Sequence, residues 1–288
     1  MRSHLTSRLA GPMLAAAAGV LYVAGPTTVW MTVICIVVIV GGLAWTAFDA
    51  VRARAMREEY GQFALQHGWE YAPVTYDYAS RFTAYPFMEG TNRRAEHMVR
   101  GDYDGGRCAT FAHVFEARSQ RDSAPLVRSH QVTLAELPVT LPRLDIVPQD
   151  LPATIAKALG GRDVDVESHA FNQRWRVLCD DPRYAHAVID PRMIERLLYP
   201  DVEGMAVRIE GGAVYVWTPG RQGAADLSRR LGAVAAIARR IPEHVIREHR
   251  ELGRTVHRGD VLTRPLSGPA WATEPGALTS GRYTGVGV

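Results

Sequence analysis

The sequence predicts an α+β protein carried on an N-terminal transmembrane helical hairpin. Two apolar stretches, at about 9–24 and 28–48, fill most of the first 48 residues. Short alternating segments separated by glycine turns dominate the middle of the chain, and amphipathic helical patterns gather towards its C-terminal end. Hairpins followed by helices, rather than strictly alternating strands and helices, indicate an antiparallel sheet with packed helices.

Composition excludes several broad classes of protein. The chain has 288 residues, of which 47% are hydrophobic and 22% are charged. These are globular values, so wholesale disorder is excluded. Three cysteines are too few for a disulfide scaffold, and a net charge of +3 gives no reason to expect a nucleic-acid partner. Lys157 is the single lysine, so arginines supply nearly all the basic charge and are weak evidence for phosphate binding.

The stretch 28–48 is the strongest membrane signal. It carries no charged residue before Asp49. Its helical length would be roughly 31 Å, close to the thickness of a bilayer core. Trp30 and Trp45 lie near its two ends, where indoles prefer the interface. Cys35 is expected at lipid depth or in a helix contact.

The stretch 9–24 is shorter, at roughly 24 Å if helical. Residues 25–28, with the sequence GPTT, predict a tight turn after it. A two-span hairpin is the favoured interpretation, while a cleaved signal peptide and a surface helix remain as alternatives. Small residues at 15–19 and 41–42 would let two helices approach closely.

Arginines set the orientation. They flank the outer ends of both stretches, at Arg2, Arg8, Arg52, Arg54 and Arg57. Positive flanks stay in the cytoplasm, and a hairpin places both flanks on one side. We therefore expect a multi-pass protein of the inner (plasma) membrane whose soluble part is cytoplasmic. The bilayer is its first partner, and a membrane protein could contact the hairpin.

The soluble part divides into a juxtamembrane helix at 49–68, a cytoplasmic α+β domain at 69–250 and a disordered tail at 251–288. Residues 72–95 are expected to be mostly loop, and a two-residue turn at Gly211-Gly212 is expected to join strands 205–210 and 213–216. A helix over 224–240 should be interrupted by Pro242 and followed by a second helix from 243. The other expected elements are strands at 97–103, 107–116, 126–137, 143–147, 164–167 and 171–179, and a helix at 151–159.

Candidate chemistry is sparse, because the usual hydrolase, zinc and nucleotide-binding motifs are missing. Asp180-Asp181-Pro182 and Asp190-Pro191 are typical of helix N-caps. His97, His113, His130 and His169 could meet in space, although His113 fits a core position between phenylalanines. We assign no catalytic, cofactor-binding or metal-binding residue and expect no cofactor.

Three further patterns have ordinary interpretations. Cys108 and Cys179 are expected to be buried, inert thiols. Asn172, Arg174 and Arg176 would line one face of the strand expected at 171–179, where a solvated face is preferred to an anion site. The arginine-rich stretch 221–258 could rest on anionic lipid, but a solvated face is again preferred.

The segment 167–198, together with HGWEY at 67–71 and VRGDYDGGRCATF at 99–111, resembles uncharacterised actinobacterial membrane proteins. In that group a membrane hairpin precedes a domain of unknown function. The resemblance implies the two-span layout and supplies no activity.

The leading functional hypothesis is a membrane-anchored cytoplasmic module that binds a protein or a ligand without catalysis, the ligand being unknown. One alternative is a membrane-tethered hydrolase that assembles two or more of His113, His130, His169 and Asp180 in a deep pocket. Another is an accessory subunit of a membrane complex, with residues 15–19 as its helix-contact face.

Overall fold

The structure is a computed structural model that describes residues 29–76, 85–117, 126–151 and 159–257, together with 155 and 261. The first apolar stretch at 9–24, most of the helix expected at 151–159 and most of the tail expected from 251 lie outside these residues. The described part is an α+β arrangement of one antiparallel sheet with packed helices, which confirms the α+β part of the prediction. One long apolar helix lies at its N-terminal end, and the second helix of the predicted hairpin falls outside the described residues.

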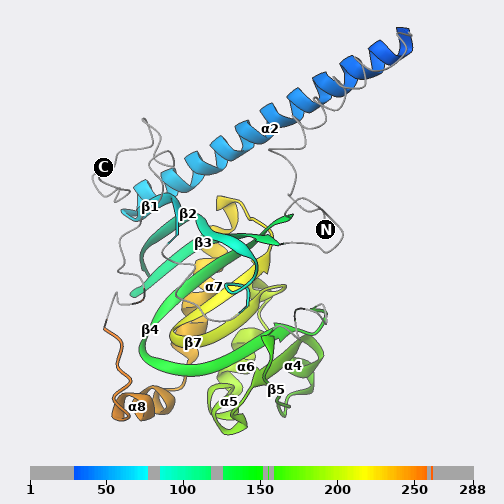
Figure 1. Cartoon of the computed structure of the whole chain (residues 1–288). Helices are drawn as coiled ribbons and strands as arrows, with labels where there is room; N and C mark the ends of the chain where they lie inside the picture. The colour runs from blue at the N-terminus through cyan, green and yellow to red at the C-terminus, as the bar shows by residue number, and fades with distance from the viewer. Residues whose placement is uncertain are drawn as a thin grey trace.

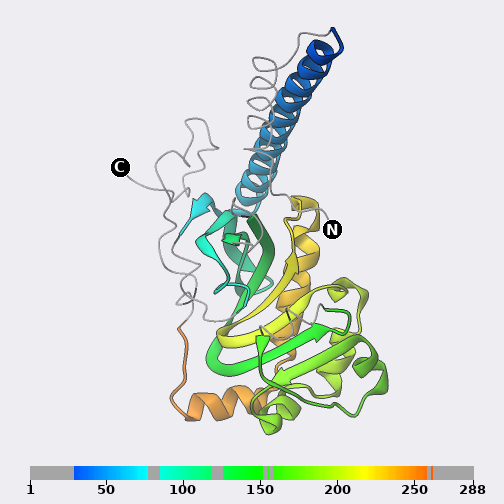
Figure 2. The ribbon, with the colours of Figure 1, turned by 45° about the vertical axis from the view of Figure 1, so that its right-hand side comes forward.

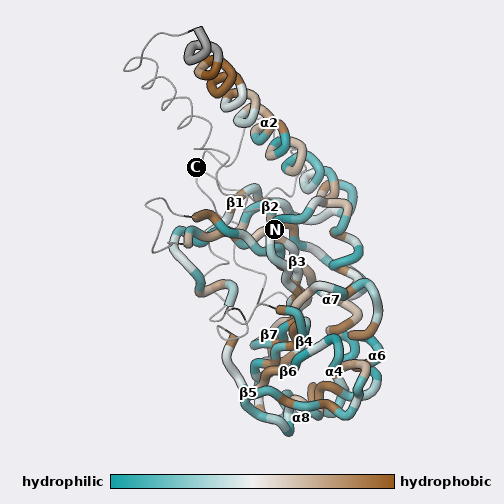
Figure 3. The backbone as a smooth tube through the Cα atoms, turned by 90° about the vertical axis from the view of Figure 1, so that its right-hand side faces the viewer, coloured by the Kyte–Doolittle hydropathy of each residue, from teal (hydrophilic) through white to brown (hydrophobic). Residues whose placement is uncertain are grey.

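The chain enters the described region through one long helix, α2 (Val29–His67). It is the helix of the described part that is long and apolar enough to cross a membrane, with a mean hydropathy of 2.2 in its most apolar window. Its N-terminal half projects away from the sheet and is strongly hydrophobic, whereas its C-terminal half is mixed (Figures 1 and 3). Gly68 ends the helix with a φ of 65°, which is typical of a C-cap and agrees with the end of the helix expected at 49–68.

Within the described ranges, seven strands form the sheet, in the order β1-β2-β3-β4-β6-β5, with β7 paired to β4. All the pairings between strands are antiparallel. A turn at Asp104-Gly105, where both residues have positive φ, joins β2 and β3 between the strands expected at 97–103 and 107–116. The strands are β1 (Glu70–Thr75), β2 (Thr91–Tyr103), β3 (Gly106–Ala117), β4 (Leu126–Pro148), β5 (Arg162–Asp163), β6 (Trp175–Cys179) and β7 (Ala206–Pro219).

The sequence-based boundaries fail most clearly at β4 and β7. The two strands expected at 126–137 and 143–147 are one strand, β4. The hairpin expected around Gly211-Gly212 is wrong, because β7 continues through both glycines and pairs with β4 before and after them. Gly211 has a φ of 60°, and the register with β4 shifts beside it. Glycine with positive φ suits a β-bulge as well as a tight turn, so the local pattern could not separate the two.

The strand expected at 171–179 is also shorter. Residues His169–Arg174 form helix α4, which Ser168 caps through a hydrogen bond to the Phe171 N–H, and β6 starts at Trp175. Asn172, Arg174 and Arg176 therefore do not line one face of a strand. Residues 164–167 are not a strand either, whereas β1 and the start of β2 occupy part of the region expected to be loop.

The remaining helices follow the predicted signals closely. Asp181 and Asp190 cap α5 (Pro182–Val188) and α6 (Pro191–Leu197), and in both helices the residue after the cap is proline. Helix α7 (Leu227–Arg240) ends before Pro242, and α8 (Glu243–Glu251) follows it. Two short 3-10 helices also lie in the described residues, η1 (Pro200–Val202) and η2 (Ala224–Asp226).

Both faces of the sheet are buried. Along β7, Val214 and Val216 join one apolar cluster, which also contains the buried side of α7. The alternate residues Tyr215 and Trp217 join a second cluster with Phe87. This alternation follows from the period of two along a strand. The turned view shows the domain as one body from which α2 projects, with α8 at the opposite end (Figure 2).

Candidate functional site

The C-terminal half of α2 packs into the core of the domain. Tyr60 and Ala64 of α2 belong to the main apolar cluster and are 1% and 2% exposed. Phe63 packs edge-on against Trp69, with ring centroids 5.6 Å apart. Gly101 makes room for that indole, because a Cβ there would lie 2.3 Å from a ring atom of Trp69. The same helix thus passes from an exposed apolar half into the core of the domain.

A buried polar network reinforces this junction. The Tyr60 hydroxyl donates to the Gln222 carbonyl at 3.0 Å, and the Arg230 guanidinium donates to the Gln222 side chain at 2.5 Å and to the Tyr60 oxygen at 3.4 Å. Burial lowers the pKa of Arg230, and the tyrosine partly offsets the effect. Gln131 accepts from the Gln222 N–H, so the network reaches β4 in the sheet. Because a buried guanidinium is costly without partners, these contacts fix α2 in one position.

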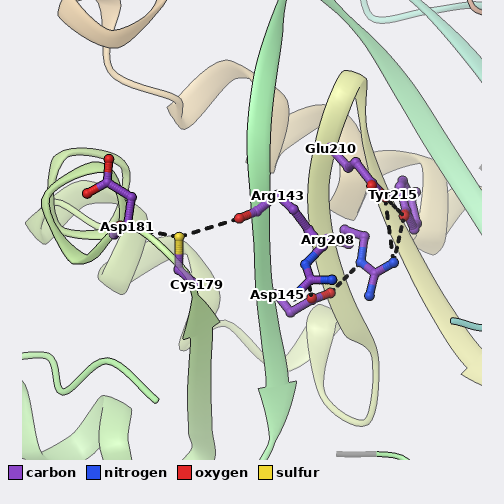
Figure 4. A network of polar contacts seen from close by, with 7 residues as sticks. All are labelled: Arg143, Asp145, Cys179, Asp181, Arg208, Glu210 and Tyr215. Atoms are coloured by element: carbon purple, nitrogen blue, oxygen red, sulfur yellow. Dashed lines mark hydrogen bonds and ion pairs between the residues drawn. The ribbon is translucent and has the colours of Figure 1, made fainter. Parts of the chain in front are cut away.

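A second network lies between β4 and β7 (Figure 4). Arg208 and Asp145 form an ion pair in which both side chains are fully buried. The Arg208 guanidinium also donates to the Tyr215 hydroxyl at 3.3 Å, and that hydroxyl donates to Glu210 at 3.0 Å. Burial raises the pKa of the Asp145 carboxyl, and Arg208 counteracts that rise. Asp145, Glu210 and Tyr215 contact Arg208 from the same two strands, which is the arrangement of a structural ion pair, although Nη2 of Arg208 and Oδ2 of Asp145 have no hydrogen-bond partner among the described residues.

His113 and His130 are the two predicted histidines that the structure brings together. They lie opposite each other on β3 and β4, with the Phe115 ring near both. The Tyr85 hydroxyl is 3.0 Å from Nε2 of His130. Burial lowers the pKa of His113 to about 4. Burial also lowers the pKa of His130, which falls to about 3 because protonation of His113 in acid disfavours a second charge beside it. Both rings are therefore neutral core residues at neutral pH.

The other candidate residues lie elsewhere. His97 contacts the Tyr71 hydroxyl through Nδ1 at 3.1 Å. His169 is exposed on α4 and contacts Gln173, and Asp180 is exposed before α5. Within the described residues, no group of three or more His, Cys, Asp or Glu side chains could hold a metal ion. Of the four residues in the hydrolase hypothesis, only His113 and His130 lie together, and both are buried in the core, whereas His169 and Asp180 are exposed on other elements.

The two domain cysteines have the surroundings of inert thiols. Cys108 is fully buried, and burial raises its pKa to about 12. Burial also raises the pKa of Cys179, whose Sγ donates to the Arg143 and Asp181 carbonyls (Figure 4). Nucleophilic cysteines need a lowered pKa and access to solvent, so neither thiol has the environment of a nucleophile.

Sequence reasoning missed a groove of about 300 Å³ between the β2–β3 turn, β4 and α7. Its walls are largely apolar, and an ion pair between Asp104 and Arg239 stands at its edge. Small side chains on α7, at Ala235 and Ala238, leave the space. The sequence signal for the groove is weak, because alanines on a helix face are also typical of close helix packing.

These features define the molecule as an α+β domain whose core includes one end of a helix that is long and apolar enough to span a membrane. No protein family matches the chain, and no curated protein matches it. Among solved structures it is similar to the mycobacterial trehalose monomycolate transport factor A, TtfA, at 16% identity and a TM-score of 0.47. The similarity covers 66% of this chain and 97% of that one. The resemblance to actinobacterial membrane proteins with a two-helix hairpin stays a prediction.

Proposed function

We propose that the chain is a membrane-anchored cytoplasmic module that binds a protein or a ligand without catalysing a reaction. One observation carries the proposal: α2 is a single helix with a lipid-compatible half and a half that belongs to the domain core. Its most apolar window is 11% buried, which is unlike the core helix of a soluble protein. Insertion of that surface into lipid removes the exposed apolar side chains from water.

The length of α2 between the bilayer and the core sets the distance of the domain from the membrane surface. From Asp49, the first acidic residue of α2, to the buried Tyr60 the helix rises about 17 Å. No break interrupts the helix over that distance. The domain is therefore held close to the bilayer surface at a set distance, instead of swinging on a flexible linker. Such a placement suits a partner that lies in or on the membrane.

The proposed anchor has two spans and places the soluble domain in the cytoplasm. Arginines at 52, 54 and 57 follow the apolar half of α2, and basic flanks remain on the cytoplasmic side. With residues 9–24 as a first span, both basic flanks are cytoplasmic and the protein is multi-pass in the inner membrane. Residues 15–19, the contact face expected for an accessory subunit, lie outside the described residues.

The absence of catalysis is proposed from the state of the titratable groups. His113 and His130 are buried in aromatic surroundings and neutral, and Asp145 is paired with Arg208. General acid–base catalysis needs groups that reach a substrate and titrate near the working pH. The hydrolase alternative gains no support from the described residues.

Topology reporters test the proposal. A reporter that fluoresces only in the cytoplasm, fused after residue 288, should be bright, and a phosphatase that is active only outside should be silent. Alkaline carbonate should leave the full chain in the membrane pellet. A silent cytoplasmic reporter with an active external one would overturn the orientation. Release of the chain by carbonate would overturn the anchor.

A further inference from the structure

One stripe of the apolar half of α2 is shielded from solvent, although this half projects away from the domain (Figure 1). Cys35 is 7% exposed, whereas its neighbours Ile34 and Ile36 are 56% and 55% exposed. Gly42 is buried beside Leu43, which is 60% exposed. A helix that stood alone would expose neighbouring positions evenly, so this pattern marks a contact face.

The shielded positions recur at helical spacing. Steps of three and four residues keep side chains on one face of a helix. Partial shielding at 38, 39, 46 and 49 extends the face in both directions, and one carboxylate oxygen of Asp49 is closed off from solvent. The α2 stripe is defined here as Cys35, Val38, Ile39, Gly42, Thr46 and Asp49.

We propose that residues 9–24 form a second membrane helix that packs antiparallel on the α2 stripe. The inference rests on the two-span anchor of the proposed function and adds its packing face and register. Only residues 25–28 separate this segment from the start of α2 at Val29, so a helical segment there must fold back alongside α2. Its length of about 24 Å would cover most of the apolar half.

The short connection also fixes the register. A turn at 25–28 places residue 24 opposite residue 29, and the pairing continues outward from there. In this register Ala18 lies opposite Cys35, and Gly11 lies opposite Gly42. Small residues on one or both sides let helix backbones approach closely, which is how helices associate in lipid. The pairs between these two contacts are apolar: Ala15 with Val38, and Leu14 with Ile39.

The ends of the two segments are complementary in charge. The same register places His4 opposite Asp49, with Arg8 one helical turn nearer the membrane centre. A shielded carboxylate at the edge of a bilayer is costly without a positive neighbour. Basic side chains before the first segment supply one, so this charge pattern favours residues 9–24 over an uncharged partner helix.

Disulfide crosslinking in native membranes tests the packing with the natural Cys35. In the full chain, Ala18→Cys introduces a fourth cysteine opposite Cys35, and Ala16→Cys is the matched control. The control position lies about 200° away around the helix, because successive residues are separated by about 100°. After oxidation with copper phenanthroline, denatured protein is labelled with a maleimide polymer that counts free thiols. An N-terminal tag reports whether the first segment is retained.

Ala18→Cys should lose two of its four free thiols, and Ala16→Cys should keep all four. Adding Cys35→Ser to Ala18→Cys should leave its three thiols unlinked. Equal linking of both variants, or linking of neither, would overturn the packing face. A crosslinked product of twice the mass would make a second copy the occupant of the stripe, and loss of the tag would show cleavage. Carbonate extraction and the topology reporters do not depend on the register, so they separate failure of this packing from failure of the anchor.

Discussion

At the scale of single residues, His113 and His130 show how burial changes the chemistry of a side chain. Both rings lie among aromatic residues that include Phe87, Tyr85 and Trp217. Burial lowers both pKa values below the usual value for histidine, so the unfolded chain binds protons more readily than the folded chain. The two histidines therefore contribute stability above about pH 6.5, and this contribution is lost as the pH falls towards 4.

A His113→Asn variant should therefore be less sensitive to acid. Between pH 7 and pH 4.5 the free energy of unfolding of the wild-type chain should fall by about 2.5 kcal/mol more than that of the variant. Urea unfolding of the full chain in detergent, followed by tryptophan fluorescence, measures the difference. His244→Asn, at an exposed position on α8, is the control and should follow the wild type. Parallel pH profiles for His113→Asn and wild type would contradict the assignment.

The Arg208–Asp145 pair is a second residue-scale case. Arg208→Met should cost about 3–5 kcal/mol, because it leaves a buried carboxylate without its main partner. Adding Asp145→Leu should recover at least half of that loss, since apolar replacement of a whole buried pair is often close to neutral. Thermal unfolding of the two single variants and the double variant gives the coupling energy. Simple additivity of the two losses would show that the pair is not coupled.

At the scale of elements, the docking of α2 depends on a side chain 170 residues away in the sequence, Arg230. Arg230→Met keeps much of the volume but removes the donors to Gln222 and Tyr60. Losing such buried hydrogen bonds costs about 1–3 kcal/mol, so the amides of residues 60–67 should exchange hydrogen roughly tenfold faster. Arg229→Met, the neighbouring and more exposed change, should leave this exchange unaltered. Unchanged exchange in Arg230→Met would show that apolar packing alone holds the helix.

The β7 strand shows where element-scale reasoning from sequence stops. Alternation along 205–216 is the same for a hairpin and for one bent strand, and Gly211 with positive φ suits both. What decides between them is β4, a strand of 23 residues that is long enough to pair with β7 on both sides of the glycines. Segment 169–174 is similar, because its alternating pattern gives way to a helix that Ser168 caps.

At the scale of the whole molecule, the apolar half of α2 and the domain should be separable at Asp49. The main apolar cluster includes Tyr60 and Ala64 of α2 but, among the described residues, none from its projecting half. A chain of residues 49–288 should therefore leave the membrane fraction and unfold within a few degrees of the full chain. A chain of residues 68–288, which lacks both side chains, should be destabilised by several kcal/mol. Equal melting temperatures for the two truncated chains would show that the end of α2 is dispensable to the domain.

The sequence by itself determined the features that short-range forces encode. These are the long apolar stretch of α2, the end of that helix at Gly68, the aspartate caps and the helix break at Pro242. Each depends on residues within about one helical turn, or on the composition of one continuous stretch, so one segment holds the whole signal.

Only the tertiary structure decided which distant segments meet. It placed His113 opposite His130, made β7 one strand on β4, and brought Arg230 to Tyr60. It also opened the groove beside α7. These outcomes depend on strand register and on the packing of long-range neighbours, where competing pairings differ little in local propensity. The free energy that separates them comes from burial of the whole core and appears in no single stretch of the chain.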